Sequence, residues 1–541
     1  MWHGKGKVSM IVLGIEGTAH TISAGIIDEE NIYYTSSRTY HPKDGGIHPR
    51  EAANHHFENI LPVIREALKE SSMNIGDIDL IGFSRGPGLG PCLKIVAVAA
   101  RSLSIRNNIP LLGVNHPMGH IEIGKRTTGS KDPLVLYVSG GNTQIITGGK
   151  GKYRVVGETL DIGIGNMLDK FARDIGIPFP GGPAIEQYAL RGKELLTLPY
   201  SVKGMDTAFS GIYTAAKHLK EKGHNVEDIC YSIQEVAFSM LCETLERAIY
   251  TTGKREILLT GGVARNGRLR EMISILAKEA NCKVFETPVE YCMDNGSMIA
   301  QAALMMYQNG IRHNLEDTSV DQKFRIDQAP APWISSGMIE VIEDQGAESV
   351  ISHNEFLGIN AVIKKRLSKS YRDKRLDGMI LNERTGREMR ILAKGIESGV
   401  NFPILLDYNS EGTEIVLEKI EGSLLNAVLE KGENLTHNIF SLGKEVAKMH
   451  NSNISHGDLN LNNIIVRGEN IFIIDPSLGS LSPGVEEFAT DIKMVNDFLA
   501  GYEDRGKALF DIFLESYKSN FQRWDEVMSV LKEMEVRKRY S

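Results

Sequence analysis

The chain has 541 residues, of which 42% are hydrophobic and 24% charged, and its formal net charge is −8. This composition is that of a globular protein, and at about 150 residues per domain the length allows three to four compact units. It excludes a disordered or collagen-like chain, and no apolar run approaches the ~18 residues that span a bilayer.

Cysteine usage and the N-terminus predict the compartment. The chain has five cysteines and no CxxC pair, which argues against a disulfide framework and a structural zinc module. The first residues lack the apolar core of a signal peptide. We therefore expect a cytoplasmic protein with no membrane partner.

The acidic excess lies wholly in the C-terminal part of the chain. Residues 1–330 carry 36 basic and 36 acidic side chains, whereas residues 331–541 carry 25 and 33. Such a chain does not bind nucleic acid by bulk charge, so an RNA partner would have to be held by local basic patches.

The first part of the chain alternates strands with helices, which predicts a mixed α/β sheet. Apolar strands enter Gly-rich turns at 10–18, 134–143 and 257–262. The first two segments are an echo of each other, that is, a weak internal similarity, because each is followed by another strand-like stretch. Apolar side chains at helical spacing predict a helix over 50–70, and these are Ala53, Phe57, Ile60, Ile64 and Leu68.

Gly-rich turns after strands let backbone N–H groups approach phosphate oxygens. Three such turns resemble the two phosphate loops and the adenosine loop of the actin-like superfold of sugar kinases and chaperone ATPases. There is a departure, because Glu16 and Ser139 stand where that superfold usually offers Asp. Those acids normally hold magnesium, so the departure puts ordinary ATPase chemistry in doubt.

Two histidines form a candidate metal site. His116 and His120 lie four residues apart at a helix start marked by Pro117, so both imidazoles share one helix face. Asp294 and Tyr137 can complete a set of nitrogen and oxygen ligands. This chemistry favours iron or a similar divalent metal, with zinc possible, over a thiolate zinc site.

These motifs together resemble the universal tRNA threonylcarbamoyladenosine synthase family over residues 10–325. The residues that carry the resemblance are His116–His120, Tyr137–Asn142, Gly181–Pro183, Gly261–Asn266 and Asp294–Gly296. The resemblance implies transfer of the threonylcarbamoyl group from threonylcarbamoyl-adenylate to the adenosine 3′ to the anticodon of tRNAs that read codons starting with A, with release of AMP.

The resemblance also implies roles for individual residues. His116, His120, Tyr137 and Asp294 would bind the metal. The acyl-adenylate would contact a run at the second turn, comprising Tyr137, Val138, Ser139, Gly140 and Gly141. The nucleoside part would contact Asp169, Gly182, Glu186 and Asn266.

Residues 326–337 have Pro-Ala alternation without an amphipathic period, which predicts an extended linker. The predicted division is therefore an actin-like domain over 1–325, the linker, and a different domain over 338–541.

The last domain carries the motifs of a protein kinase in order. Lys364 ends an apolar strand, Glu388 lies on a helical stretch, and Asp458 and Asn463 match a catalytic loop with a base and a metal ligand. Asp475 follows the next strand as a second metal ligand. This set predicts binding of ATP with magnesium and a minimal bilobal kinase-like fold.

The departures from that pattern are as informative as the match. The expected phosphate-covering loop at 344–350 has one glycine, Asp475 is followed by Pro-Ser, and only 66 residues follow it. The domain resembles the small RIO-like kinase of the KEOPS complex, which implies an ATPase or restricted serine/threonine kinase. The resemblance also implies KEOPS partners, with a small dimerising subunit on the first domain and another small subunit on the kinase-like domain.

The stretch 364–375 has seven basic residues against one acid, and a second basic cluster lies at 537–539. A solvated face and a tRNA-backbone contact are both open interpretations, and the second places Arg366, Lys369 and Arg372 on the outside. For the whole chain, the alternative is a small-molecule carbamoyltransferase fused to a non-catalytic kinase-like scaffold.

Overall fold

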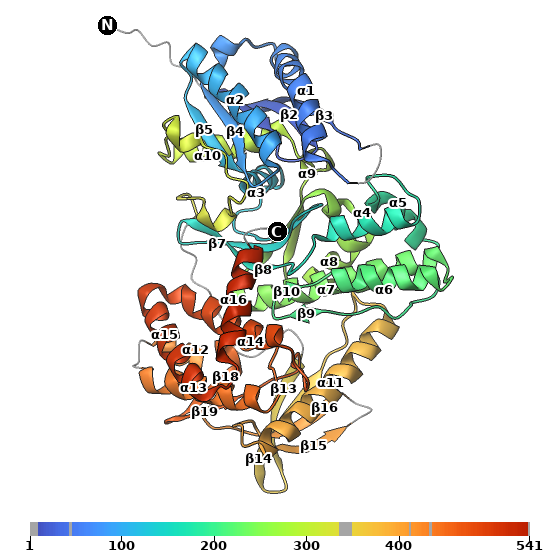
Figure 1. The fold of residues 1–541 in the computed structure, drawn as a ribbon, viewed down its shortest axis with the longest axis vertical. Helices are drawn as coiled ribbons and strands as arrows, with labels where there is room; N and C mark the ends of the chain where they lie inside the picture. The colour runs from blue at the N-terminus through green and yellow to red at the C-terminus, as the bar shows by residue number, and fades with distance from the viewer. Residues whose placement is uncertain (1–8, 43–45, 335–348, 410–412, 432–434, 539–541) are drawn as a thin grey trace. The chain divides into compact units, whose positions relative to one another are not determined.

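The computed structural model describes residues 9–42, 46–334, 349–409, 413–431 and 435–538. The chain forms two compact units (Figure 1), one of residues 1–200 and 208–341, and the other of residues 201–207 and 342–540. Among the described residues, no helix combines the length and the apolar character needed to cross a membrane.

The first unit contains two five-stranded sheets of the same topology. The first has the order β3-β2-β1-β4-β5, with β1 Val12–Glu16, β2 Thr21–Ile27, β3 Ile32–Thr39, β4 Leu80–Gly86 and β5 Leu111–Asn115. The second has the order β12-β11-β6-β7-β8, with β6 Leu134–Val138, β7 Thr143–Gly149, β8 Lys152–Glu158, β11 Glu256–Thr260 and β12 Lys283–Glu286.

The two sheets share their pairing pattern as well as their order. β1 is antiparallel to β2 and parallel to β4, and β6 is likewise antiparallel to β7 and parallel to β11. The sequence echo between 10–18 and 134–143 therefore reflects two equivalent strand–turn–strand units. This repeated topology is that of the predicted actin-like, two-lobed fold.

Helices surround these sheets (Figure 1), and their bounds are α1 Pro49–Glu70, α2 Gly90–Asn107, α3 His116–Thr128, α4 Ile164–Asp174, α5 Gly182–Ala189, α6 Ser210–Glu221, α7 Val226–Thr252, α8 Gly267–Glu279, α9 Val289–Cys292 and α10 Gly296–Gln308. The predicted helix over 50–70 is α1, but Phe57 is 74% exposed. The buried stripe of α1 runs through His56, Ile60, Val63 and Ala67, which leaves Phe57 beyond its edge.

Helix α10 lies directly on the first sheet because glycines leave room for its backbone. A Cβ on Gly14 would lie 2.1 Å from the carbonyl oxygen of Gly296, and one on Gly25 would lie 2.3 Å from the Ser297 nitrogen. This close approach fixes the start of α10 against β1 and β2, and thereby places Asp294, which precedes it.

The first part of the predicted linker packs on the first unit instead. Ile326, Ala329 and Ala331 are buried, and the Ala331 N–H donates to the carbonyl of Gly151. The indole N–H of Trp333 donates to Glu122 at 2.8 Å. The extended-linker prediction is thus wrong for residues 326–334, because their alternating small side chains fit the edge of β8, while 335–337 lie outside the described residues.

The second unit begins with a four-stranded sheet of order β13-β14-β16-β15, followed by a mainly helical part. The sheet part comprises β13 Ser349–Phe356, β14 Ile359–Arg366, α11 Lys374–Glu397, β15 Leu405–Asn409 and β16 Glu414–Glu418. The rest comprises β17 Ser423–Leu424, α12 Leu425–Glu430, α13 Thr436–Asn451, β18 Ile464–Arg467, β19 Asn470–Ile473, α14 Val485–Leu499, α15 Glu503–Asn520 and α16 Trp524–Lys538. This is the predicted bilobal kinase-like architecture.

A short hairpin from the middle of the chain also belongs to the second unit. Its strands are β9 (Val202–Lys203) and β10 (Asp206–Thr207). The Asp206 carboxylate lies 3.3 Å from the Lys493 ammonium, and the Lys203 ammonium lies 3.6 Å from the Glu487 carboxylate. Lys493 and Glu487 are residues of α14. No local pattern predicts this placement, because the hairpin is separated from α14 by more than 270 residues.

Candidate active site

The metal-ligand candidates of the first unit come from two helix starts. His116 is the first residue of α3, whose N-cap Asn115 accepts a hydrogen bond from the Met118 N–H at 3.2 Å. Asp294 immediately precedes Asn295, which caps α10 in the same way. Each cap fixes the first helical turn, so the side chains next to it have defined positions.

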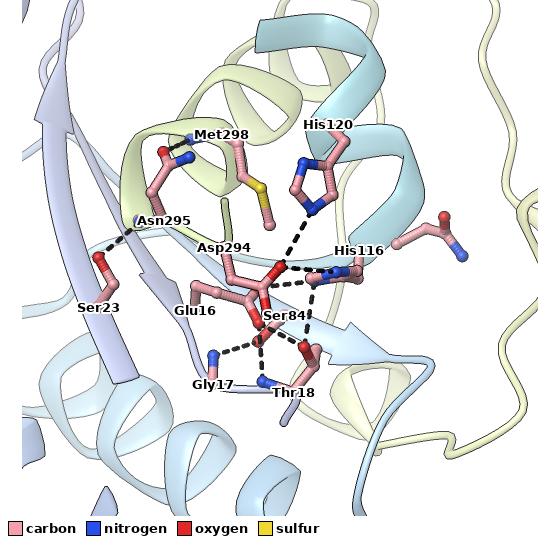
Figure 2. Close-up of polar contacts among 12 residues, drawn as sticks. Glu16, Gly17, Thr18, Ser23, Ser84, His116, His120, Asp294, Asn295 and Met298 are labelled. Atoms are coloured by element: carbon pink, nitrogen blue, oxygen red, sulfur yellow. Dashed lines mark hydrogen bonds and ion pairs between the residues drawn. The ribbon is translucent and has the colours of Figure 1, made fainter. Parts of the chain in front are cut away.

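The structure brings His116, His120 and Asp294 together (Figure 2). The Nε2 atoms of His116 and His120 lie 3.5 Å and 3.2 Å from the same Asp294 oxygen, and one ligand atom from each residue lies within 4.8 Å of the others. His120 Nδ1 is buried and has no hydrogen-bond partner among the described residues. Two imidazoles and a carboxylate around one point, with no thiolate among them, fit a divalent metal such as iron or zinc.

The ionisable groups of this cluster shift one another's pKa values. Burial alone would lower the pKa of His116, but the carboxylates of Glu16 and Asp294 raise it to about 9. Burial would raise the pKa of Asp294, yet the two histidines hold it below its ordinary value. The pocket therefore favours positive charge between its carboxylates, which is consistent with a cation site.

Tyr137 lies beside the same cluster. Its ring centroid is 5.1 Å from that of His120, and the side chain is 1% exposed. Burial and, after it, the Asp294 carboxylate raise the pKa of the Tyr137 phenol. Its role as a metal ligand stays a prediction.

Strand β6 runs from Tyr137 into the second Gly-rich turn. The Ser139 N–H donates to the Asn142 carbonyl, and the Asn166 N–H at the start of α4 donates to the Gly140 carbonyl. The third turn lies against this strand, since a Cβ on Gly261 would lie 2.3 Å from the Val138 carbonyl oxygen. Two of the predicted loops therefore converge beside the metal-ligand candidates.

The four predicted nucleoside contacts lie on or next to three helices that are linked by hydrogen bonds. Asp169 on α4 accepts from the Gly181 N–H at 2.7 Å, next to Gly182 at the start of α5. Glu186 on α5 accepts from the Gly267 N–H at 2.7 Å, next to Asn266, the N-cap of α8. The Asn266 amide also donates to Gln234, so this side chain has a structural role whatever it binds.

In the second unit, the Lys364 ammonium contacts two other residues of the predicted ATP site. Lys364 Nζ lies 2.9 Å from Glu388 and 2.6 Å from Asp475. Glu388 is fully buried and also pairs with Arg366. A lysine held by a helix glutamate beside a metal-binding aspartate is the arrangement that positions ATP phosphates in kinases.

The catalytic-loop candidates form a second connected group. Asn463 Nδ2 donates to the Asp458 carbonyl at 2.8 Å and lies 3.3 Å from its carboxylate. The Ile474 N–H donates to the Asn463 carbonyl, which links the loop to Asp475. Sequence reasoning missed Asp491, whose buried carboxylate accepts from the N–H groups of His456 and Gly457 and so supports the loop.

The outward orientation expected for the basic stretch is wrong. Arg366, Lys369 and Arg372 are buried, and Arg366 and Arg372 form ion pairs with Glu388 and Asp377. Arg366 shares a face of β14 with Lys364 because side chains two residues apart point the same way. The exposed basic residues of the stretch are Lys365, Lys374 and Arg375.

Two other predicted features fall largely outside the described residues. Of the phosphate-covering loop at 344–350, only Ser349 and Val350 are described, at the start of β13. Of the basic cluster at 537–539, the described part is the backbone at the end of α16.

Comparison with known proteins agrees with both halves of this arrangement. Residues 31–301 match the family tRNA N6-adenosine threonylcarbamoyltransferase, and residues 351–506 match the RIO domain. A bifunctional tRNA threonylcarbamoyladenosine biosynthesis protein of Thermoplasma acidophilum is 52% identical over 98% of this chain and 100% of its own length. The chain belongs to this bifunctional family.

Other members of the bifunctional family are similar over the same extent. The relative from Thermoplasma volcanium is 50% identical and that from Methanothermobacter thermautotrophicus 44% identical, each over 98% of this chain and 100% of its own length. The chain is thus a tRNA threonylcarbamoyladenosine synthase fused to a RIO kinase-like domain, with tRNA as its substrate class.

Among solved structures, a HypF protein of T. kodakarensis is 18% identical, with a TM-score of 0.42 over 58% of this chain and 49% of its own.

Proposed function

We propose that the first unit transfers the threonylcarbamoyl group from threonylcarbamoyl-adenylate to the adenosine 3′ to the anticodon of tRNAs that read codons starting with A, and releases AMP. The observation that carries this proposal is the course of β6. The strand places Tyr137 beside His116, His120 and Asp294, and then enters the Gly-rich turn at Ser139. The candidate metal ligands and the candidate phosphate-binding turn therefore lie next to each other.

Acyl transfer from a mixed anhydride has a good leaving group, so the protein must mainly orient the reactants and stabilise developing charge. His116, His120, Tyr137 and Asp294 would hold a divalent metal, with iron favoured, which would act as a Lewis acid. The backbone at Gly140 and Gly141 has room for close approach of a phosphate, since a Cβ on Gly141 would meet no atom within 4 Å. Asp169, Gly182, Glu186 and Asn266 would contact the nucleoside.

Mass spectrometry of nucleosides tests this function directly. Purified full-length chain is incubated with threonylcarbamoyl-adenylate and unmodified tRNA, and the tRNA is then digested. We expect threonylcarbamoyladenosine at the position 3′ to the anticodon. Acyl transfer to a small acceptor with unmodified tRNA would instead favour the alternative, a small-molecule carbamoyltransferase.

The second unit is proposed to turn over ATP with magnesium in support of this transfer. Lys364 and Glu388 would position the phosphates, Asn463 and Asp475 would bind magnesium, and Asp458 would act as the base. The convergence of Glu388 and Asp475 on Lys364 supports this assignment. If wild-type and Asp458→Asn chains hydrolyse ATP equally, the unit is a non-catalytic scaffold.

We further propose that the chain works in the cytoplasm within a KEOPS complex. Support comes from exposed apolar side chains on the adjacent helices α1 and α2 of the first unit. Phe57 and Leu61 are 74% and 51% exposed, and Val98 and Ile105 are 63% and 65% exposed. Such side chains suit a small dimerising partner subunit, and a second small subunit would bind the kinase-like unit. Phe57→Ser with Val98→Ser should prevent co-purification of the first subunit.

A further inference from the structure

The acid of the first loop, Glu16, contacts His116, one of the metal-ligand candidates. Its side chain is fully buried at the end of β1, and its Oε2 lies 3.1 Å from His116 Nδ1. In Figure 2 dashed lines join the His116 ring to both acids, and the contacts run from Nδ1 to Glu16 and from Nε2 to Asp294.

Thr18 closes this arrangement within the same turn. Its hydroxyl donates to Glu16 Oε1 at 2.6 Å, and its backbone N–H donates to the same oxygen at 2.7 Å. The hydroxyl oxygen also lies 3.2 Å from His116 Nδ1. Because the Thr18 proton is directed at Glu16, both oxygens beside His116 Nδ1 are hydrogen-bond acceptors.

Two acceptors at Nδ1 determine which tautomer of His116 is favourable. The ring satisfies both only when Nδ1 carries a hydrogen, and in the neutral ring that leaves the lone pair on Nε2. A metal can bind only the nitrogen that carries the lone pair, and Nε2 is the one that faces Asp294.

We propose that Glu16, held by Thr18, is a positioning residue that fixes His116 in the tautomer that binds the metal through Nε2. This inference rests on the metal site of the proposed function. It also accounts for the departure of the first loop from the ATPase pattern: the acid of the loop orients a metal ligand, and its carboxylate is occupied by His116 and Thr18.

The test measures metal binding by the full-length chain, independently of transfer activity. Metal-free protein is titrated with Co²⁺ alone, and the dissociation constant and the visible d–d spectrum are recorded. Glu16→Ala should weaken Co²⁺ binding by about 10- to 100-fold, the usual effect of removing a carboxylate that supports a metal-bound histidine. Thr18→Val should weaken Co²⁺ binding less than Glu16→Ala does. Thr18→Ser, which keeps the hydroxyl, should have the affinity and spectrum of the wild type.

Glu122→Gln is the matched control, because Glu122 is a buried carboxylate of α3 that instead accepts hydrogen bonds from Trp333 and Tyr153. It should bind Co²⁺ like the wild type. If Glu16→Ala does not fold, the comparison of Thr18→Val with Thr18→Ser still tests the inference. Wild-type affinity in both Glu16→Ala and Thr18→Val, or equal losses in Thr18→Val and Thr18→Ser, would overturn the inference. A wild-type chain that shows the expected metal pattern but leaves tRNA unmodified would overturn the transfer proposal alone.

Discussion

The guanidinium of Arg372 lies 3.1 Å from the Asp377 carboxylate, and both side chains are almost completely buried. Charge reversal at this position would leave two carboxylates together in a site with little solvent. We therefore expect Arg372→Glu to lower the free energy of unfolding of the second unit by at least about 3 kcal/mol, which is typical when a buried ion pair loses one partner. Urea unfolding measures the loss.

Lys374→Glu is the matched control, since Lys374 is exposed two residues further along. Surface substitutions usually change stability by less than about 0.5 kcal/mol. A similar loss in both variants would contradict the buried assignment of Arg372.

The exposed residues of the same stretch are the better candidates for a tRNA contact. Joint charge reversal of Lys365, Lys374 and Arg375 should weaken tRNA binding and reduce its dependence on salt. Each lost phosphate contact lowers the slope of log affinity against log salt by about 0.7 to 0.9. Binding measured across a salt series gives this slope. If the affinity and the slope are unchanged, tRNA is held elsewhere.

Much of the fold and the clustering of the metal-ligand candidates can be predicted from the sequence. The strand–turn echo between 10–18 and 134–143 and the helix start marked by Pro117 are local patterns, and the structure confirms both. The contact between Glu16 and His116 cannot be predicted from the sequence. The two residues are 100 positions apart, and no local pattern indicates which acid contacts which imidazole.

The errors have physical reasons in particular residues. The charge of the stretch 364–375 alone predicts an exposed Arg366, whereas strand alternation beyond Lys364 places this side chain on the buried face of β14. The Pro-Ala run around Ala329 and Ala331 is typical of linkers and therefore predicts one. In the folded chain their spacing of two suits packing on the edge of β8.

Removal of both imidazoles should abolish metal binding by the first unit. The double variant His116→Ala with His120→Ala loses two of the three clustered donors, so we expect no stoichiometric metal and no transfer to tRNA while the chain stays folded. Elemental analysis and circular dichroism provide the measurements. The control is His218→Ala with His224→Ala, a pair of exposed histidines. Unchanged metal content in the first variant would show that the ligand assignment is wrong.

Asp458 and Lys364 should differ in how they affect ATP use. Asp458→Asn should lower the turnover of ATP by about 10²- to 10⁴-fold with little change in ATP binding, because a general base acts on the transition state. Lys364→Ala should also weaken binding, since its ammonium would contact the phosphates. Steady-state hydrolysis and nucleotide titration separate the two effects. Asp407→Asn, at an exposed position on β15, serves as the control. Equal losses of binding and turnover in Asp458→Asn would indicate a structural role.

His56 should make the first unit sensitive to acid. Its imidazole is fully buried on α1 without a hydrogen-bond partner for either nitrogen among the described residues, and burial, with the nearby His55, lowers its pKa to about 4. Between pH 6.5 and 4 the unfolded chain therefore binds a proton that the folded chain does not, so stability falls as the pH falls. At 1.36 kcal/mol per pKa unit, the loss from pH 7 to pH 4.5 is about 2.5 kcal/mol. Urea unfolding of His56→Leu should show a correspondingly smaller difference between the two pH values, whereas His224→Leu, at an exposed position, should behave like the wild type. An undiminished acid dependence in His56→Leu would show that another group titrates.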